Sequence, residues 1–214
     1  GTVDYAEGLR LQLELRERVR QGRLADTLLL LQHPPVITLG RSARRQHVLA
    51  SDEALRRRGI ELQQVSRGGD VTYHGPGQLV GYPVRRVARR VRHHVQGMAG
   101  ALARVLERDH GVVARWEQGR PGLWTHAGKI AAVGVDARGG VAIHGFALNV
   151  RPDLGDYALI VPCGIQAAAV TSMAQLLGQD CPTVEQLVDP VAIELARQYG
   201  CEAVPVAPQD VLPP

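Results

Sequence analysis

The chain has 214 residues, 45% of them hydrophobic and 21% charged, with a net charge of +4 and a pI near 9.3. These values describe an ordinary globular protein, and we expect one domain over residues 1–214. Aromatic residues make up only 4%, which argues against a single-strand nucleic-acid binder. No apolar run reaches the roughly 20 residues of a membrane span, and the first residues do not resemble a signal peptide. We therefore expect a cytoplasmic protein that binds neither nucleic acid nor membrane.

The N-terminal half predicts alternating helices and strands. Tyr5, Leu9, Leu13 and Val19 recur at near-helical spacing among charged residues, which predicts an amphipathic helix. Short apolar runs at 27–32, 36–39 and 79–84 predict strands, the first of them stopped by His33 and two prolines. Apolar residues from 95 to 106 then mark one face of a long helix, which we expect to end at Gly111.

The C-terminal half contains the strongest hairpin signal. Two β-rich runs, 129–136 and 141–150, flank Arg138, Gly139 and Gly140. A further apolar run at 158–161 predicts a strand that ends before Cys163. Thr183 and Gln186 form a capping-box pattern for a last helix, which Pro190 is expected to interrupt. Together the elements predict an α+β fold with a mixed β-sheet packed with helices.

Lysine is nearly absent from the chain. Arginine and lysine total 25, and Lys129 is the only lysine. Arginine remains protonated in proteins, whereas a buried lysine can lose its proton and act as a base. Lys129 is either a surface residue or a catalytic base, and its apolar neighbourhood, AGKIAAVGV, favours the second interpretation.

Two further segments carry candidate chemistry. The run RGGDVTYHGPGQLVGYP at 67–83 has five glycines among Arg, Asp, Tyr and His, which lets the backbone approach a ligand closely. The spacing of its glycines does not fit GxGxxG, and GKI at 128–130 lacks the Ser or Thr of a P-loop. A segment built only for turning is the alternative. Cys163 follows an apolar run and precedes Gly164, a context that suits a nucleophile or a small buried hydrophobe.

Five ordered motifs between residues 26 and 178 resemble the lipoyl(octanoyl) transferase family. They are HPPVITLGR, RGGDVTYHGPGQLVGYP, GKIAAVGV, HGFALNV, and PCGI followed by VTSM. Asp70 stands where glutamine is common in the family, and Phe146 where leucine is common. The resemblance implies a biotin/lipoate protein ligase-like fold. We expect Phe146 to narrow the acyl tunnel and so to affect chain-length preference.

The resemblance also implies the reaction, its partners and its residues. An octanoyl or lipoyl group passes from acyl carrier protein to a lysine of a lipoyl domain, in 2-oxoacid dehydrogenase complexes or the glycine cleavage H protein. The reaction passes through a thioester on Cys163, assisted by Lys129, and needs no cofactor, metal or ATP; we expect a monomer. An ATP-dependent lipoate-protein ligase and a non-catalytic acyl-binding module stay open as alternatives. The implied substrate contacts are Arg67, Gly68, Gly69, Asp70, Val71, Thr72, Tyr73, His74, Ala132, Val133, Gly134, His144, Gly145 and Phe146.

Overall fold

A six-stranded antiparallel sheet forms the centre of the protein. The computed structural model describes residues 1–88, 90–161, 169–207 and 211, and the counts below refer to these. The strand order is β1-β5-β9-β8-β7-β6, with every pairing antiparallel. The bounds are β1 (Thr27–Leu31), β5 (Gln78–Arg86), β9 (Val141–Asn149), β8 (Gly128–Asp136), β7 (Arg120–Thr125) and β6 (Arg115–Glu117).

A three-stranded sheet lies beside the larger one. It consists of β3 (Glu61–Gln64), β2 (Val36–Leu39) and β4 (Val71–His74), in that order. The β2 strand pairs in parallel with β3 and antiparallel with β4, so this smaller sheet is mixed. The expected α+β class is confirmed, and parallel pairing among the described strands is confined to the small sheet.

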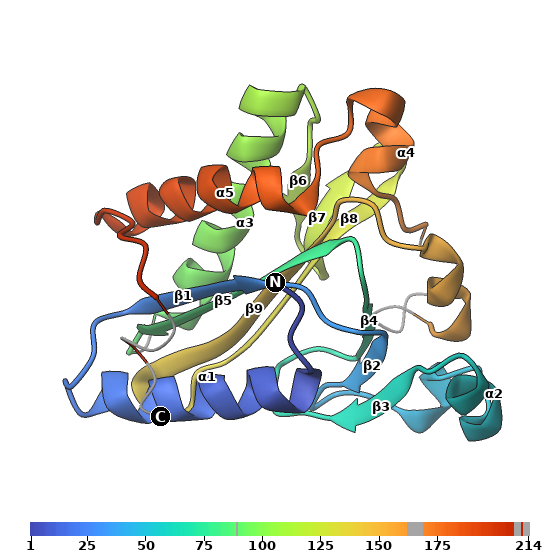
Figure 1. Cartoon of the computed structure of the whole chain (residues 1–214), viewed down its shortest axis with the longest axis horizontal. Helices are drawn as coiled ribbons and strands as arrows, with labels where there is room; N and C mark the ends of the chain where they lie inside the picture. The colour runs from blue at the N-terminus through green and yellow to red at the C-terminus, as the bar shows by residue number, and fades with distance from the viewer. Residues whose placement is uncertain (89, 162–168, 208–210, 212–214) are drawn as a thin grey trace.

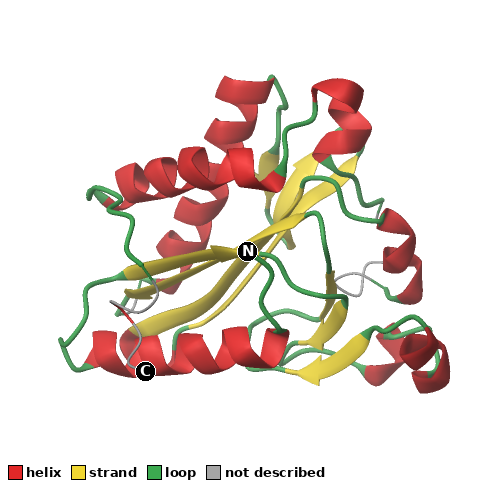
Figure 2. Ribbon diagram, viewed as in Figure 1, coloured by secondary structure: helices red, strands yellow, loops and turns green. Residues whose placement is uncertain are grey.

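Helices cover both faces of the large sheet (Figures 1 and 2). On one face, α3 (Val91–His110) and α5 (Val184–Tyr199) enclose the main core with Leu79, Phe146 and Leu148. On the other face, α1 (Tyr5–Arg20) packs Leu15 and Val19 against β5 and β9. The short helices are α2 (Asp52–Arg57), α4 (Met173–Leu177) and the 3₁₀ turns η1 (Arg45–His47), η2 (Arg138–Gly140), η3 (Leu154–Leu159) and η5 (Gly178–Asp180). Within the described ranges, no helix is long and apolar enough to cross a bilayer.

The predicted hairpin is confirmed as β8 and β9. Its register pairs Val133 with Phe146 and Gly134 with Gly145. Gly139 and Gly140 adopt φ values of 70° and 80° in the turn, a conformation that glycine reaches without a steric penalty. The N-terminal helix, the three strand runs and the long helix also match the expectations from the sequence, the last ending at Gly111 with φ 66°.

Two expectations were wrong. Residues 158–161 do not form a strand: the 3₁₀ turn η3 takes up their first half, and only Ile160 bridges to Val48. Pro190 does not interrupt the last helix, because α5 continues from Val184 to Tyr199. Packing of Leu187, Val191 and Leu195 in the main core outweighs the one hydrogen bond that proline cannot donate.

Candidate active site

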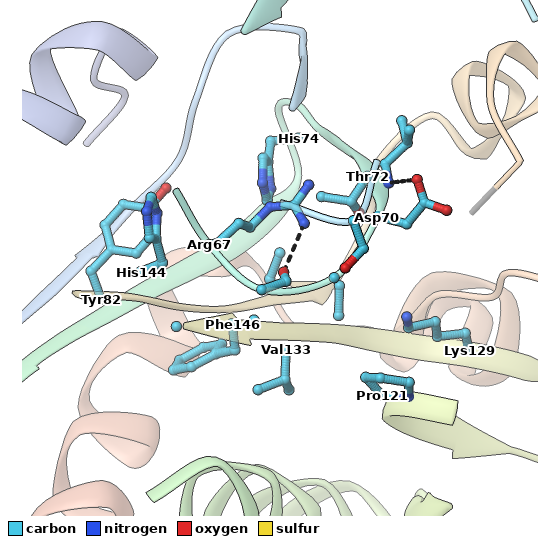
Figure 3. Close-up of a pocket in the computed structure, with 18 of the residues that line it drawn as sticks. Arg67, Asp70, Thr72, His74, Tyr82, Pro121, Lys129, Val133, His144 and Phe146 are labelled. Carbon is cyan, nitrogen blue, oxygen red and sulfur yellow. Dashed lines mark hydrogen bonds between the residues drawn. The ribbon is translucent and has the colours of Figure 1, made fainter. Parts of the chain in front are cut away.

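A cavity of about 220 Å³ lies between strands β8 and β9 and the segment that runs from Arg67 to His74 (Figure 3). It collects nearly all the site residues expected from the sequence. Among the expected residues that the structure describes, Tyr73 is the exception: its ring is buried in the core beside the small sheet and meets the Tyr157 ring edge-on, with 5.6 Å between centroids. The expected residues on the cavity wall are Arg67, Gly68, Gly69, Asp70, Val71, Thr72, His74, Lys129, Ala132, Val133, Gly134, His144, Gly145 and Phe146.

Small residues let the two sides of the cavity approach each other. The Gly68 N–H donates to the Val135 carbonyl at 2.9 Å, which attaches the glycine-rich segment to the sheet. A Cβ at Gly134 would lie 2.9 Å from the Gly68 carbonyl oxygen. The glycine at 134 is therefore required by the close approach of the Gly68 backbone, which belongs to the glycine-rich segment.

Lys129 lies on β8 at one end of the cavity and is 5% exposed. Its backbone N–H donates to the Ala169 carbonyl at 2.9 Å, and its own carbonyl accepts from the Thr171 N–H at 3.0 Å. The Nζ atom lies 5.7 Å from the centroid of the Trp124 ring. Lys129 is thus a buried residue whose backbone N–H and carbonyl are both bound to the segment 169–171, rather than a surface lysine.

Gly122 makes room for the lysine side chain, and the sequence did not reveal this role. A Cβ at Gly122 would lie 2.3 Å from the Ala131 carbonyl oxygen and 2.5 Å from Lys129 Cε. Its φ of 125° also disfavours any other residue. A lone glycine inside a strand was the available signal, since it marks close approach of another group.

Cys163 lies outside the described residues, but the described chain on either side of it is attached to the cavity. Before it, the Val161 N–H donates to the His47 carbonyl at 2.7 Å, and His47 Nδ1 lies 2.6 Å from a carboxylate oxygen of Asp70. After it, Ala169 binds Lys129 as described above. The chain after the Cys163 segment therefore contacts a cavity-lining residue directly, and the chain before it does so through His47.

The other two cysteines lie away from the cavity. Cys181 is buried in the main core, where burial raises the pKa of its thiol. Its Sγ donates to the Val150 carbonyl at 3.6 Å. Cys201 is exposed just after α5, and its Sγ donates to the Ala196 carbonyl at 3.5 Å. Neither thiol is placed to react with a ligand in the cavity.

Arg67 lines the cavity on the side of the small sheet. Its Nη2 donates to the Thr38 carbonyl and to Thr38 Oγ1, each at 2.7 Å, and its Nη1 donates to the Gly68 carbonyl at 3.2 Å. Because these acceptors surround the planar guanidinium, Arg67 holds the glycine-rich segment against β2.

The end of the cavity opposite Lys129 is built from uncharged histidine and tyrosine rings. Burial lowers the pKa of His144 to about 4, with the charge of Arg67 acting in the same direction. Burial also lowers the pKa of His74 well below its ordinary value and raises the pKa of Tyr5 to about 12. These groups are therefore neutral near pH 7.

Phe146 both lines the cavity and packs in the main core. Its ring packs in the main core above Gly81, where a Cβ would lie 2.1 Å from Phe146 Cζ. Figure 3 shows the ring on the helix side of the strand, away from Arg67 and His74. The aromatic ring occupies the space that a side chain at Gly81 would need, and its effect on the width of the acyl tunnel stays a prediction.

Comparison with known proteins defines first a class and then a family. Residues 4–196 match the model of the lipoyl protein ligase A/B catalytic domain. P. falciparum LipL1 in complex with lipoate superposes with a TM-score of 0.74 at 14% identity, covering 94% of this chain and 63% of that one. Lipoate-protein ligase A bound with ATP gives 0.68 at 17% identity, covering 98% and 88%. The fold is therefore that of the lipoate protein ligase class.

Full-length relatives narrow the assignment. The octanoyltransferase of Acidobacterium capsulatum is 45% identical over 100% of this chain and 94% of its own length. The octanoyltransferase of Alkaliphilus metalliredigens is 42% identical over 83% of each chain. The chain belongs to the octanoyltransferase family.

Proposed function

We propose that this protein is an acyltransferase that moves an octanoyl or lipoyl group from acyl carrier protein to a lysine of a lipoyl domain. The observation that carries the proposal is the placement of Lys129, which is buried at the cavity wall and bound through its backbone to the chain that follows Cys163. The octanoyltransferase family membership supports the same reaction.

The first half-reaction uses Cys163 as the nucleophile. Lys129 is the base that takes the thiol proton, and the thiolate attacks the carbonyl carbon of the donor thioester. A bond forms between Cys163 Sγ and the acyl carbon, the bond to the carrier sulfur breaks, and the carrier thiolate takes the proton from the Lys129 ammonium. The acyl group is then held as a thioester on the enzyme.

The second half-reaction forms the amide. The acceptor lysine attacks the thioester as an amine and gives a proton to Lys129, while the bond from Cys163 Sγ to the acyl carbon breaks. Lys129 then returns the proton to the Cys163 thiolate. The donor is already activated, so the cycle closes without ATP, metal or cofactor.

The cavity wall supplies the acyl site in this proposal. Ala132, Gly134, Gly145 and Ala147 expose little more than backbone and methyl groups, so an acyl chain can lie along β8 and β9. Arg67 and the segment that follows it close the opposite side. Acyl carrier protein as donor and lipoyl domains as acceptors are the proposed partners.

A transfer assay tests this function. The purified chain is mixed with octanoyl-carrier protein and an apo-lipoyl domain without ATP, and the acceptor mass is measured. Octanoylation of the acceptor supports the transferase. Octanoylation that appears only with free octanoate and Mg-ATP would instead make the chain a ligase, and octanoate binding without either product would make it a binding module.

A further inference from the structure

The pairing of strands β7 and β8 contains an irregularity beside Lys129. Leu123 pairs with Ala131. The next residue, Trp124, pairs with Lys129 rather than with Ile130, so β8 has one extra residue at this point. Such a bulge re-aims the neighbouring side chains, and bulges are frequent next to active sites. Because directly opposed residues of an antiparallel pair lie close together, the bulge brings the Trp124 indole beside the lysine.

The lysine side chain lies against two residues of β7. A Cβ at Gly122 would lie 2.5 Å from Lys129 Cε, and Nζ lies over the Trp124 ring, 5.7 Å from the centroid. A lysine ammonium within about 6 Å of an aromatic centroid is attracted by the negative face of the ring. A neutral amine can also donate an N–H to that face. The ring can therefore face Nζ in both protonation states of the amine.

The indole ring is itself held at its edge and on its face. Its Nε1–H donates to the Arg120 carbonyl at 2.9 Å, and the Arg120 guanidinium lies over the ring with 3.6 Å between Cζ and the centroid. The Arg120 side chain also forms an ion pair with Glu117. Trp124 is only 5% exposed. A buried ring that is bound in two directions has little freedom to turn away from Lys129.

We propose that Trp124, held by Arg120, is a positioning residue for Lys129, and that its ring keeps Nζ at the end of the cavity where the proton is exchanged. The proposal rests on the acyltransferase function proposed above. An aromatic face suits this role because a cation–π contact is weaker than a buried pair of opposite charges. The ring therefore orients the amine without holding its proton as strongly as a carboxylate would.

Transfer kinetics test the role of the aromatic face. Trp124→Leu should lower kcat about tenfold, which matches the free energy of a desolvated cation–π contact, and should leave KM for octanoyl-carrier protein within about twofold of wild type. Trp124→Phe keeps an aromatic face and should lower kcat less than about threefold. Wild-type kcat in folded Trp124→Leu, or an equal loss in Trp124→Phe, would overturn the proposal.

Two further variants separate positioning from packing. If Trp124→Leu does not fold, Trp124→Met removes the aromatic face with a smaller loss of volume and should show the same loss of kcat. Trp116→Leu is the matched control, because Trp116 is the chain's other tryptophan and lies on the paired strand β6, partly buried against the main core. It should lower the free energy of unfolding without changing kcat. An equal fall of kcat in this control would assign the effect to packing and contradict the proposal.

The single lysine of the chain provides a readout that does not depend on transfer. Lysine labelled with carbon-13 at Cε gives one NMR signal, that of Lys129. Relaxation of this signal should show a restricted side chain in wild type, Trp124→Phe and Trp116→Leu, and a more mobile one in Trp124→Leu. Equal mobility in wild type and Trp124→Leu would overturn the proposal.

The two measurements distinguish failure of the positioning role from failure of the function. Octanoyl transfer by wild type, with unchanged kcat in Trp124→Leu, removes only the positioning role. If wild type transfers no acyl group from carrier protein, the acyltransferase function fails. The relaxation measurement then still decides whether the Trp124 ring orients the lysine side chain.

Discussion

Arg67 and Lys129 are two nearly buried cations that line the same cavity, 8% and 5% exposed respectively, yet their surroundings differ. The guanidinium of Arg67 donates to Thr38 and Gly68, so its fork geometry is used to hold backbone and hydroxyl oxygens. The lysine amine instead lies beside Trp124 and against Gly122, near the anchor of the Cys163 segment. The comparison teaches that the permanent charge of an arginine suits a structural brace, whereas a lysine amine, which can exchange a proton, suits the role proposed for Lys129.

Of the variants that test this comparison, replacements of Lys129 should have the largest effect on transfer. Lys129→Met and Lys129→Arg should each lower single-turnover octanoyl transfer about 100-fold or more, because neither can exchange a proton with thiol and amine. Thermal unfolding should change little for Lys129→Met, since methionine fills a similar volume without a buried charge. Transfer within threefold of wild type in either variant would remove the proton-transfer role.

Replacing Arg67 should instead affect mainly stability. Arg67→Ala should lower the free energy of unfolding by about 4 kcal/mol, because hydrogen bonds to a charged group each contribute about 2 kcal/mol and buried acceptors would be left unpaired. Urea denaturation measures the change. Thr38→Val removes one acceptor and should cost less than half as much. If Arg67→Ala kept its stability and lost only transfer, Arg67 would belong with Lys129 in the chemistry.

Gly122→Ala should affect only the end of the cavity at which Lys129 lies. The added methyl group meets the Ala131 carbonyl and Lys129 Cε, so we expect about 3 kcal/mol of destabilisation and roughly tenfold slower transfer. Gly119→Ala is the matched control on the same hairpin: its φ of 82° is also strained, but nothing lies within 4 Å of the new Cβ. Chemical denaturation should show a lower free energy of unfolding in both variants. Single-turnover rates should show slow transfer only in Gly122→Ala. Equal transfer rates in the two would mean that Lys129 tolerates displacement.

Acid sensitivity should come from the histidines near Arg67, since the arginine charge does not titrate. His144 has a pKa of about 4 when folded and about 6.5 when unfolded, so the unfolded state takes up the proton first as the pH falls. The neutral His144 ring contributes fully to the free energy of unfolding above about pH 6.5, and this contribution is lost as the pH falls toward 4. Between pH 7 and 5 the loss is about 2 kcal/mol for this residue.

His144→Asn isolates this contribution. Asparagine tolerates the left-handed backbone at position 144 and does not titrate. Urea denaturation at pH 7 and pH 5 should show a smaller pH dependence for the variant, by about 2 kcal/mol. An unchanged dependence would assign the acid sensitivity to other groups, with buried His33 and His74 the next to examine.

Local signals in the sequence predicted much of the fold. The turn glycines located the β8–β9 hairpin, helical spacing located α1 and α3, and the Thr183 and Gln186 capping box located the start of α5. The strand predicted at 158–161 was wrong because an apolar run indicates burial but not strand pairing. Within this run only Ile160 forms a bridge, with Val48. Strand β4, inside the glycine-rich segment, was missed. Its pairing partner β2 lies more than 30 residues earlier, and the local sequence does not show such a distant pairing.

Motifs in the sequence predicted most residues that line the cavity, whereas contacts between distant segments were missed. Lys129 was singled out by composition, and the glycine-rich segment by its density of glycines. The pairing of Tyr82 with His33, and of Gly122 with the Lys129 side chain, depends on how distant strands meet. Sequence spacing does not encode the direction of the Phe146 ring, which is why its packing in the main core was not expected.

The central claim is that the acyl group resides on Cys163 beside a cavity served by Lys129. Intact-mass spectrometry of the chain mixed with octanoyl-carrier protein, without ATP, tests it most directly, with Cys163→Ala and the core variant Cys181→Ala alongside. The account predicts an octanoyl mass gain that hydroxylamine removes, that Cys163→Ala abolishes and that Cys181→Ala retains. An adduct that persists in Cys163→Ala, or transfer to the acceptor by that variant at the wild-type rate, would contradict it.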